Sequence, residues 1–433
     1  QYCVALVEDV SIKYIRMATF ITSFSRFIDK MKVFGVVLCL AAVSGFKLYE
    51  ITPENEAQSQ AVYELYKTHP NFNFMKLARF PNETSHVVVS PKDQANFNSY
   101  VSHNTLKTKM MYDDISQEIN VKLRMPRQYI VPGQLDLNHY YGYNEIIVYL
   151  RALVQKYPQR IRFEQISYNS YQGKVIPLVR IGNGNGMKSK VIFMDAGIHA
   201  REWITPMVAL YTIYQLVENY DSNSDLLKDH DWLIIPIVNP DGYEYSRVYD
   251  PLWRKTRKPN LCSIGTDANR NFDSHWAEIG TSSSGCEPTY HGDYAFSENE
   301  SKAVAAVLDH YKSNIKFYLA LHSYGNYMLY PWGFTSQLPK NWKIIHEVAE
   351  AGANAIYSFN RFERYRVGSV TNTLYPASGG AMDYAMEKAG IPIAITMEIG
   401  QRTFGPHPLE ISGLVKTAWV GVQAMARKAA KKY

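Results

Sequence analysis

The sequence predicts an α/β protein with a mixed central sheet covered by helices on both faces, preceded by a small α+β unit of ferredoxin-like order. Three observations lead to this prediction. From residue 128 onward, apolar strand patterns alternate with helical patterns. The strands are near-continuous apolar runs, as in a sheet buried on both faces. Polar residues of functional types stand where several of these strands stop.

The small unit covers residues 46 to about 112. The order strand, helix, strand, strand, helix, strand is the βαββαβ arrangement of ferredoxin-like domains. The unit has no cluster of metal-ligating residues, and its simplest interpretation is a packing or binding module. The expected strands are 47–52, 71–77, 86–90 and 105–112, and the expected helices are 54–68 and 92–103.

A basic linker follows, with Lys122, Arg124 and Arg127 around Met125-Pro126. The residue before a proline is disfavoured in a helix, so this stretch should be exposed. Exposed loops are the usual sites of proteolysis, which predicts cleavage by a trypsin-like protease near Arg127. The alternative is a basic loop that is never processed.

The large unit, 128–433, has the dimensions of one α/β domain. Expected strands are 161–168, 175–181, 191–196, 232–238, 316–321 and 391–396. Expected helices are 144–156, 206–218, 297–312, 341–358, 379–388 and 409–428.

A candidate metal site lies at the ends of two of these strands. His199 and Glu202 form an H-x-x-E after strand 191–196, and His322 follows strand 316–321. Two histidines and a carboxylate are the ligands of a catalytic zinc site that keeps its fourth position open. H-x-x-E alone is a weak signal, and both residues could be ordinary loop residues.

Other functional residue types strengthen the interpretation. Arg254 and the pair Asn269-Arg270 add cationic and amide groups, and Glu398 follows strand 391–396. In open α/β sheets, ligand crevices form where strands end. The chain is therefore expected to be a hydrolase.

The N-terminal region predicts secretion. Met31-Lys32, the apolar run 33–43 and Ser44-Gly45 match a secretory signal over residues 31–45. The run is too short for a transmembrane helix, so no membrane partner is expected. Residues 1–30 are interpreted as a non-native leader, although a genuine extension or anchor is the alternative.

The cysteines agree with secretion. Outside the expected leader and signal only Cys262 and Cys286 remain, and a single pair in a secreted chain should form a disulfide worth roughly 3 kcal/mol.

Two sequons, at Asn82 and Asn299, permit glycosylation. The net charge of +6 comes without a long basic block, so nucleic acid is not expected as a partner.

The large unit resembles the pancreatic-type zinc carboxypeptidases of the A/B subfamily, and residues 46–127 resemble their activation propeptide. Seven motifs occur in the order typical of the family. They are H-A-R-E-W-I-T (199–205), N-P-D-G-Y (239–243), W-R-K-T-R (253–257), D-A-N-R-N-F-D (267–273), H-S-Y (322–324), Y-P-A-S-G-G (375–380) and the late Glu398.

The resemblance implies a role for each matched position. Asp267 would orient the first histidine, Glu398 would be the general base that takes a proton from the zinc-activated water, and Arg254 would stabilise the oxyanion. The zinc ligands, one ion per chain, would be His199, Glu202 and His322. The substrate's C-terminal carboxylate would be held by Asn269 and Arg270 and covered by the mobile Tyr375, and Arg201 and Tyr324 would be subsite residues.

Substrate preference follows from the side-chain pocket that the resemblance implies. Its base, seven residues after the mobile tyrosine, is Met382, and Val370 and Gly333 also line it. A pocket without a counter-ion should reject Lys or Arg, because burying an unpaired charge is costly. The family usually has E-L-R-D-T-G-x-Y-G-F where this chain has 398–406, so the exact preference stays open.

The resulting hypothesis is a secreted, monomeric zymogen of a carboxypeptidase A-type enzyme. It would act on peptide and protein C-termini, prefer aromatic or aliphatic terminal residues, and be activated by a trypsin-like protease. One alternative is a non-catalytic protein of the same fold that binds peptide C-termini. Another is a zinc deacylase or amidase, which would lack the carboxylate clamp.

Overall fold

The computed structural model describes residues 45–69, 71–115 and 133–433. The expected leader, nearly all of the expected signal segment and the linker around Arg127 lie outside these residues.

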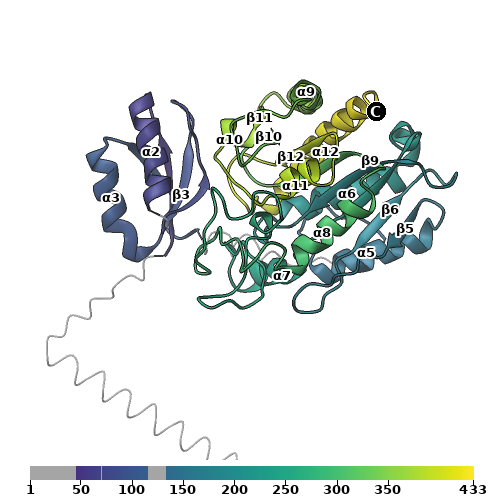
Figure 1. Cartoon of the computed structure of the whole chain (residues 1–433), viewed down its shortest axis with the longest axis horizontal. Coiled ribbons are helices and arrows are strands. Elements are labelled where there is room, and N and C mark those ends of the chain that lie inside the picture. Colours follow the sequence, from purple (N-terminus) through teal and green to yellow (C-terminus); the bar gives the residue numbers. More distant parts are fainter. Residues whose placement is uncertain (1–44, 70, 116–132) are drawn as a thin grey trace, which may run out of the picture. The chain divides into compact units, whose positions relative to one another are not determined.

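The small unit has the predicted βαββαβ order (Figure 1). Its antiparallel sheet has the strand order β2-β3-β1-β4, and Val62, Leu65 and Phe97 of the two helices pack in its core. The first helix begins at Glu56 rather than at residue 54, because the Asn55 side chain caps it by accepting a hydrogen bond from the Gln58 amide at 3.0 Å. The elements are β1 (Lys47–Thr52), α2 (Glu56–Thr68), β2 (Asn73–Lys76), β3 (Ser85–Val89), η1 (Pro91–Asp93), α3 (Gln94–His103) and β4 (Lys107–Tyr112).

The large unit is built on a mixed eight-stranded sheet, which confirms the predicted fold class. Its order is β11-β10-β12-β9-β7-β8-β6-β5, with parallel pairing from β12 through β9 and β7 to β8. The strands are β5 (Ile161–Glu164), β6 (Leu178–Ile181), β7 (Lys190–Ala196), β8 (His230–Ile235), β9 (Ile315–His322), β10 (Tyr327–Tyr330), β11 (Arg366–Ser369) and β12 (Ala394–Glu398).

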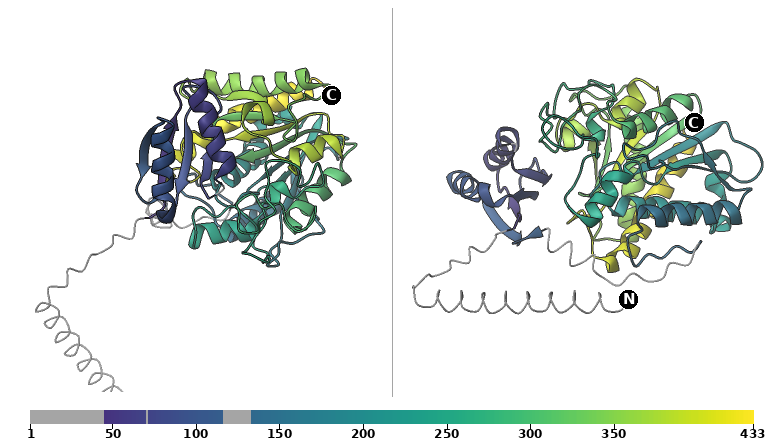
Figure 2. Two further views of the ribbon diagram at one scale, coloured as in Figure 1. Left: turned by 60° about the vertical axis from the view of Figure 1, so that its left-hand side comes forward. Right: turned by 90° about the horizontal axis from the view of Figure 1, so that it is seen from below.

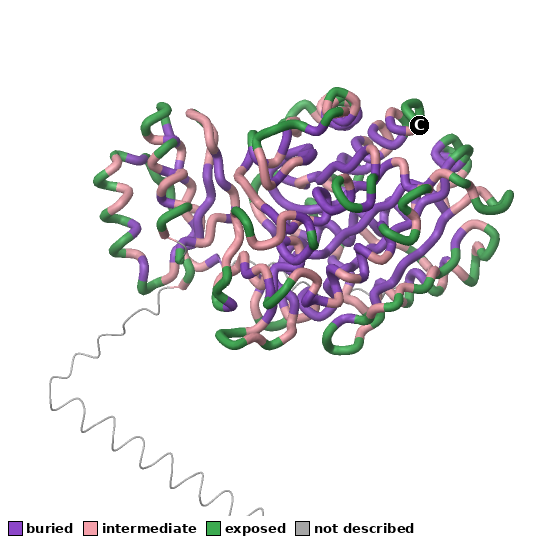
Figure 3. The backbone as a smooth tube through the Cα atoms, in the orientation of Figure 1, coloured by how far each residue is buried: buried purple, intermediate pink, exposed green. Residues whose placement is uncertain are grey.

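Helices cover both faces of this sheet, and β7 shows why. Ile192 and Met194 belong to the core shared with α6, α9 and α12, whereas Val191 and Phe193 belong to the core shared with α8 and α11. Successive side chains of a strand point to opposite faces, so both faces are apolar. Figure 2 shows helices on both sides of the sheet, and Figure 3 shows that its central strands are buried. The helices are α5 (Tyr143–Lys156), α6 (Ile204–Val217), α7 (Pro240–Val248), α8 (Asn299–His310), α9 (Trp342–Phe359), α10 (Val370–Thr373), α11 (Ala381–Glu387) and α12 (Pro408–Ala430), with the short 3-10 turns η2 (Tyr220–Ser222), η3 (Ser224–Leu227) and η4 (Ala268–Arg270).

The structure corrects several of the expected elements. Strand 161–168 stops at Glu164, and β10, β11, α7 and α10 were not predicted. The two extra strands have four residues each, too few for a recognisable period. The N-P-D-G sequence favours a turn, yet Asn239 caps α7 by accepting from the Gly242 amide, with Pro240 in the first turn where its missing N–H costs nothing.

None of the helices in the described part of the chain is both long enough and apolar enough to span a bilayer.

Candidate active site

The site lies at the carboxyl ends of three neighbouring strands. His322 and Glu398 are the last residues of β9 and β12 and are paired in the register of the sheet. His199 and Glu202 lie in the turn between β7 and α6, which leaves the strand through Gly197 at φ +67°. A side chain at position 197 would be strained and would come within 3.2 Å of Pro206, so this turn requires glycine.

The three predicted ligands converge. The Nδ1 atoms of His199 and His322 are 3.1 Å apart, and they lie 2.8 and 3.2 Å from the two carboxylate oxygens of Glu202. Within the residues that the structure describes, this is the one group of three possible ligands close enough to share an ion. Two nitrogens bound to tetrahedral zinc at about 2.0–2.1 Å stand roughly 3.3 Å apart, so the donor set fits zinc.

Glu202 is held as an anion. Burial by itself would raise its pKa, but the charges and hydrogen bonds of His199 and His322 lower the pKa well below the usual range. The Ser323 amide also donates to its Oε2 at 3.1 Å. A buried carboxylate that stays ionised suits a metal ligand.

Asp267 links the metal site to the neighbouring cation. Its Oδ1 lies 3.1 Å from His199 Nε2, and its Oδ2 accepts from Arg254 Nε at 2.9 Å. Burial alone would raise the pKa of Asp267, but Arg254, His199 and Arg270 together hold it well below its usual range. This contact leaves His199 Nδ1 facing the other ligands, as expected of a carboxylate behind a metal-bound histidine.

Glu398 has the opposite electrostatic environment. Burial, the largest effect, raises its pKa to about 7, and the positive charge of His322 limits the rise. A general base works best when its pKa lies near the operating pH. The surroundings of the two glutamates therefore shift their pKa values in opposite directions, down for Glu202 and up for Glu398.

The predicted carboxylate clamp belongs to η4 and lines the same cavity as the predicted metal ligands. Arg270 is 5% exposed, and its guanidinium donates to the carbonyls of Gly280 and Asn269, both at 3.0 Å. Asn269 Oδ1 accepts from the Ala381 amide at 2.9 Å, which leaves its NH2 group as the available donor. Both side chains are thus held by other polar groups before any substrate arrives.

Met382 is one of the uncharged residues that line the cavity, together with Val370 and Gly333. Its sulfur lies 3.5 Å from the Thr396 hydroxyl. The neighbouring Asp383 also lines the cavity, but its carboxylate accepts twice from the Gly333 amide, at 2.9 and 3.1 Å, and burial raises its pKa to about 7. Sequence reasoning missed Asp383, because a residue adjacent to the pocket base has no recognisable pattern of its own.

The predicted subsite residues Arg201 and Tyr324 both contact Phe404, which lies in the segment 398–406 where this chain differs from the usual family sequence. The guanidinium of Arg201 lies 4.1 Å from the Phe404 ring, which also meets Tyr324 edge-on at 4.9 Å. The Tyr324 hydroxyl lies 2.7 Å from His86 Nδ1 of the small unit. Phe404 was not predicted as a site residue. Residues 398–406 differ from the sequence that the family usually has there, so Phe404 could not be matched to a family position.

One cavity of about 130 Å³ collects all the predicted ligand, catalytic and substrate-binding residues. Asp267 lies behind it. The predicted residues that line the cavity are His199, Arg201, Glu202, Arg254, Asn269, Arg270, His322, Tyr324, Tyr375, Met382 and Glu398, with Val370 and Gly333.

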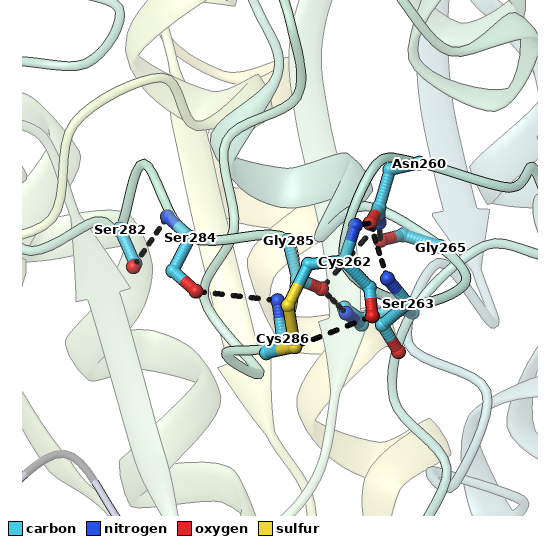
Figure 4. Close-up of a disulfide and its surroundings, with 9 residues drawn as sticks. Asn260, Cys262, Ser263, Gly265, Ser282, Ser284, Gly285 and Cys286 are labelled. Atoms are coloured by element: carbon cyan, nitrogen blue, oxygen red, sulfur yellow. Dashed lines mark hydrogen bonds between the residues drawn. A yellow bond between two sulfur atoms is a disulfide. The ribbon is translucent and has the colours of Figure 1, made fainter.

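Cys262 and Cys286 form the predicted disulfide, with Cα atoms 5.5 Å apart (Figure 4). Asn260 stabilises the same loop: its side chain accepts from the amides of Cys262 and Ser263 and donates to Gly265. The buried Lys255, directly after Arg254 in the sequence, donates to the Gly285 carbonyl at 2.6 Å and so connects the disulfide loop to the segment that carries Arg254.

Comparison with known proteins places this site in a family. Residues 146–421 match the zinc carboxypeptidase family, and residues 49–121 match the carboxypeptidase activation peptide. Zinc carboxypeptidase A 1 of Anopheles gambiae is 33% identical over 83% of each chain, and carboxypeptidase B of Astacus astacus is 40% identical over 61% of this chain and 88% of its own. The crystal structure of carboxypeptidase A from Helicoverpa armigera matches with a TM-score of 0.82 at 29% identity, covering 90% of this chain and 98% of the other. The chain therefore belongs to the zinc carboxypeptidase family and carries its activation peptide.

Proposed function

We propose that this carboxypeptidase removes aromatic or aliphatic residues from peptide C-termini. The observation that carries the proposal is the composition of one cavity. The predicted metal ligands, Glu398 and the pair Asn269-Arg270 line the same cavity as the apolar Met382, which we assign to the base of the side-chain pocket. The clamp selects a free C-terminal carboxylate. The Asp383 carboxylate already accepts a hydrogen bond from the Gly333 amide, so the pocket offers no free counter-ion to a Lys or Arg side chain.

Each residue then has one task. Zinc, when held by His199, Glu202 and His322, supplies a Lewis acid that activates water and polarises the scissile carbonyl. Glu398 accepts a proton from the attacking water and returns it to the departing amine. Arg254, aimed by Asp267, stabilises the developing oxyanion.

Substrate positioning falls to the remaining residues of the cavity. Arg270 binds the terminal carboxylate through a charge-assisted hydrogen bond, with Asn269 donating beside it. Tyr375 closes over the bound end. Arg201 and Tyr324 contact residues upstream of the scissile bond.

Contacts of the small unit support an inactive precursor. The Tyr66 ring lies 5.7 Å from the Tyr375 ring, and residues of β2 also line the cavity. Substrate and this unit compete for the same space. We propose that the chain is secreted as a monomer and that a trypsin-like protease cleaves it near Arg127.

The test is hydrolysis of blocked dipeptides ending in Phe, Leu or Lys, before and after trypsin and with or without a zinc chelator. We expect chelator-sensitive release of Phe or Leu that appears after trypsin. Release of Lys alone would overturn the pocket assignment while leaving the mechanism. No release by folded, zinc-loaded protein would support a binding protein instead.

A further inference from the structure

Two sequons remain outside the proposed function, and the structure treats them differently. We propose that Asn82 carries an N-linked oligosaccharide and that Asn299 does not. The proposal rests on entry into the secretory pathway, not on catalytic activity. The disulfide between Cys262 and Cys286 agrees with such an oxidising compartment.

Asn82 lies at the tip of the turn between β2 and β3 and is exposed. Its backbone adopts φ +64°, a left-handed conformation that asparagine tolerates, and its amide donates to the Pro53 carbonyl at 2.7 Å. Among the described residues, its side-chain amide has no hydrogen-bond partner. The backbone is therefore held in place while the acceptor nitrogen is free and faces solvent.

The residues around Asn82 keep the turn in this shape without using its side chain. Arg366 pairs with Glu83, and its guanidinium lies 4.3 Å from the Phe80 ring. Glu83, the middle residue of the sequon, and Phe80, two residues before Asn82, are thus both held by Arg366, and a sugar attached to Asn82 displaces neither contact.

Asn299 lies in a packed environment instead. It is the first residue of α8, and its neighbours Glu298 and Glu300 are 2% and 0% exposed. The Ser301 hydroxyl of the sequon donates to Asn271 Oδ1 at 2.7 Å. This segment must dock into the core as the large unit folds, which disfavours a bulky glycan at its half-buried asparagine.

The modification is a group transfer. The Asn82 Nδ2 atom forms a bond to C1 of the oligosaccharide and loses one proton. The C1–O bond to the donor, a lipid-diphosphate-linked oligosaccharide, breaks, and the lipid diphosphate leaves. Cleavage near Arg127 would then separate the glycan from the active enzyme together with the small unit.

The test uses the full chain secreted from a eukaryotic cell. Peptide-N-glycosidase in ¹⁸O-water converts a glycosylated asparagine to labelled aspartate, which peptide mass spectrometry locates. We expect label at Asn82 and none at Asn299. An unlabelled Asn82, or label at Asn299, would overturn the proposal.

Matched variants distinguish loss of the glycan from misfolding of the protein. Asn82→Gln and Thr84→Ala should each remove the glycan and its shift in electrophoretic mobility, whereas Thr84→Ser and Asn299→Gln should keep both. After trypsin, the glycan should be found only on the released small unit, and Asn82→Gln should hydrolyse dipeptides as fast as the parent. A glycan shift that persists in Thr84→Ala would place the modification elsewhere. Because the glycan and peptide hydrolysis are measured separately, failure of one is distinguishable from failure of the other.

Discussion

At the scale of single residues, the site depends on two buried glutamates with opposite tendencies. Glu202 is kept ionised by the two histidines, whereas burial raises the pKa of Glu398 to about 7. The same residue type is therefore suited to bind a metal as an anion at one position and to accept a proton at the other, which are the roles that we propose. The environment, not the residue type, distinguishes them.

Replacing Glu398 by Gln should remove the proton acceptor and leave the metal ligands untouched. We expect kcat to fall by about 10²–10⁴-fold, the usual contribution of general acid–base catalysis. Zinc content, measured by atomic absorption, should be unchanged. Substantial residual turnover would remove Glu398 from the role of base.

Met382→Asp should add a counter-ion at the pocket base. We expect kcat/KM to shift from C-terminal Phe and Leu toward Lys and Arg, because the buried cation then has a partner. Met382→Leu is the matched control and should keep the apolar preference. If Met382→Asp loses Phe hydrolysis and gains no Lys hydrolysis, Met382 does not determine the preference.

At the scale of elements, α8 carries a buried carboxyl that the mechanism does not use. Glu300 is 0% exposed, its Oε1 accepts from the Tyr171 amide at 3.4 Å, and its Oε2 has no hydrogen-bond partner among the residues that the structure describes. Burial, with the nearby charges of Glu298 and Asp241, raises its pKa to about 8 from an ordinary value of 4.5. The folded protein thus keeps a proton that the unfolded chain releases.

This makes folding stability depend on pH in a defined direction. The proton stabilises the fold fully below pH 4.5, and the contribution is lost as the pH rises through 8. Glu300→Gln keeps the shape without the titration. We therefore expect its Tm to exceed that of the parent by a few degrees more at pH 9 than at pH 5.

The measurement is thermal unfolding of both proteins across this pH range. Glu350→Gln, at an exposed position on α9, is the control and should track the parent at every pH. An equal Tm difference at pH 5 and pH 9 would show that Glu300 does not titrate in this window.

At the scale of the whole molecule, residues of the small unit line the same cavity as the predicted site residues of the large unit. Tyr66 lies against Tyr375, and His86 lies within 2.7 Å of the Tyr324 hydroxyl. Arg79 also donates to the Thr371 carbonyl at 2.7 Å. These contacts cover residues proposed to bind substrate.

Tyr66→Ala should therefore weaken inhibition before cleavage. We expect the uncleaved variant to hydrolyse a blocked dipeptide several-fold faster than the uncleaved parent, since the removed ring frees Tyr375 and space for the terminal residue. After trypsin, both chains should give the same kcat/KM, because the small unit is gone. Equal rates before cleavage would mean that Tyr66 takes no part in blocking the site.

Much of the fold was predictable from local patterns. The βαββαβ order of the small unit and the six predicted strands of the large unit follow from the period and length of their apolar patterns. The H-x-x-E after residues 191–196 indicated one part of the site. The four-residue strands β10 and β11 have too little pattern to be recognised. Asp383 and Phe404 acquire their positions only through packing, so no local signal could reveal them.

The sequence by itself determined most of the element types, although not β10, β11, α7 and α10, together with the disulfide partners and, through its motifs, the family. Only the tertiary structure decided that His199, Glu202 and His322, which are separated by up to 123 positions, bring their ligand atoms to within 2.8–3.2 Å of one another. The physical reason is the sheet. The neighbouring strands β7, β9 and β12 run parallel, so their carboxyl ends meet at one edge and bring distant side chains together. Burial at that edge then sets the charge state of each carboxylate, which no reading of residue types could supply.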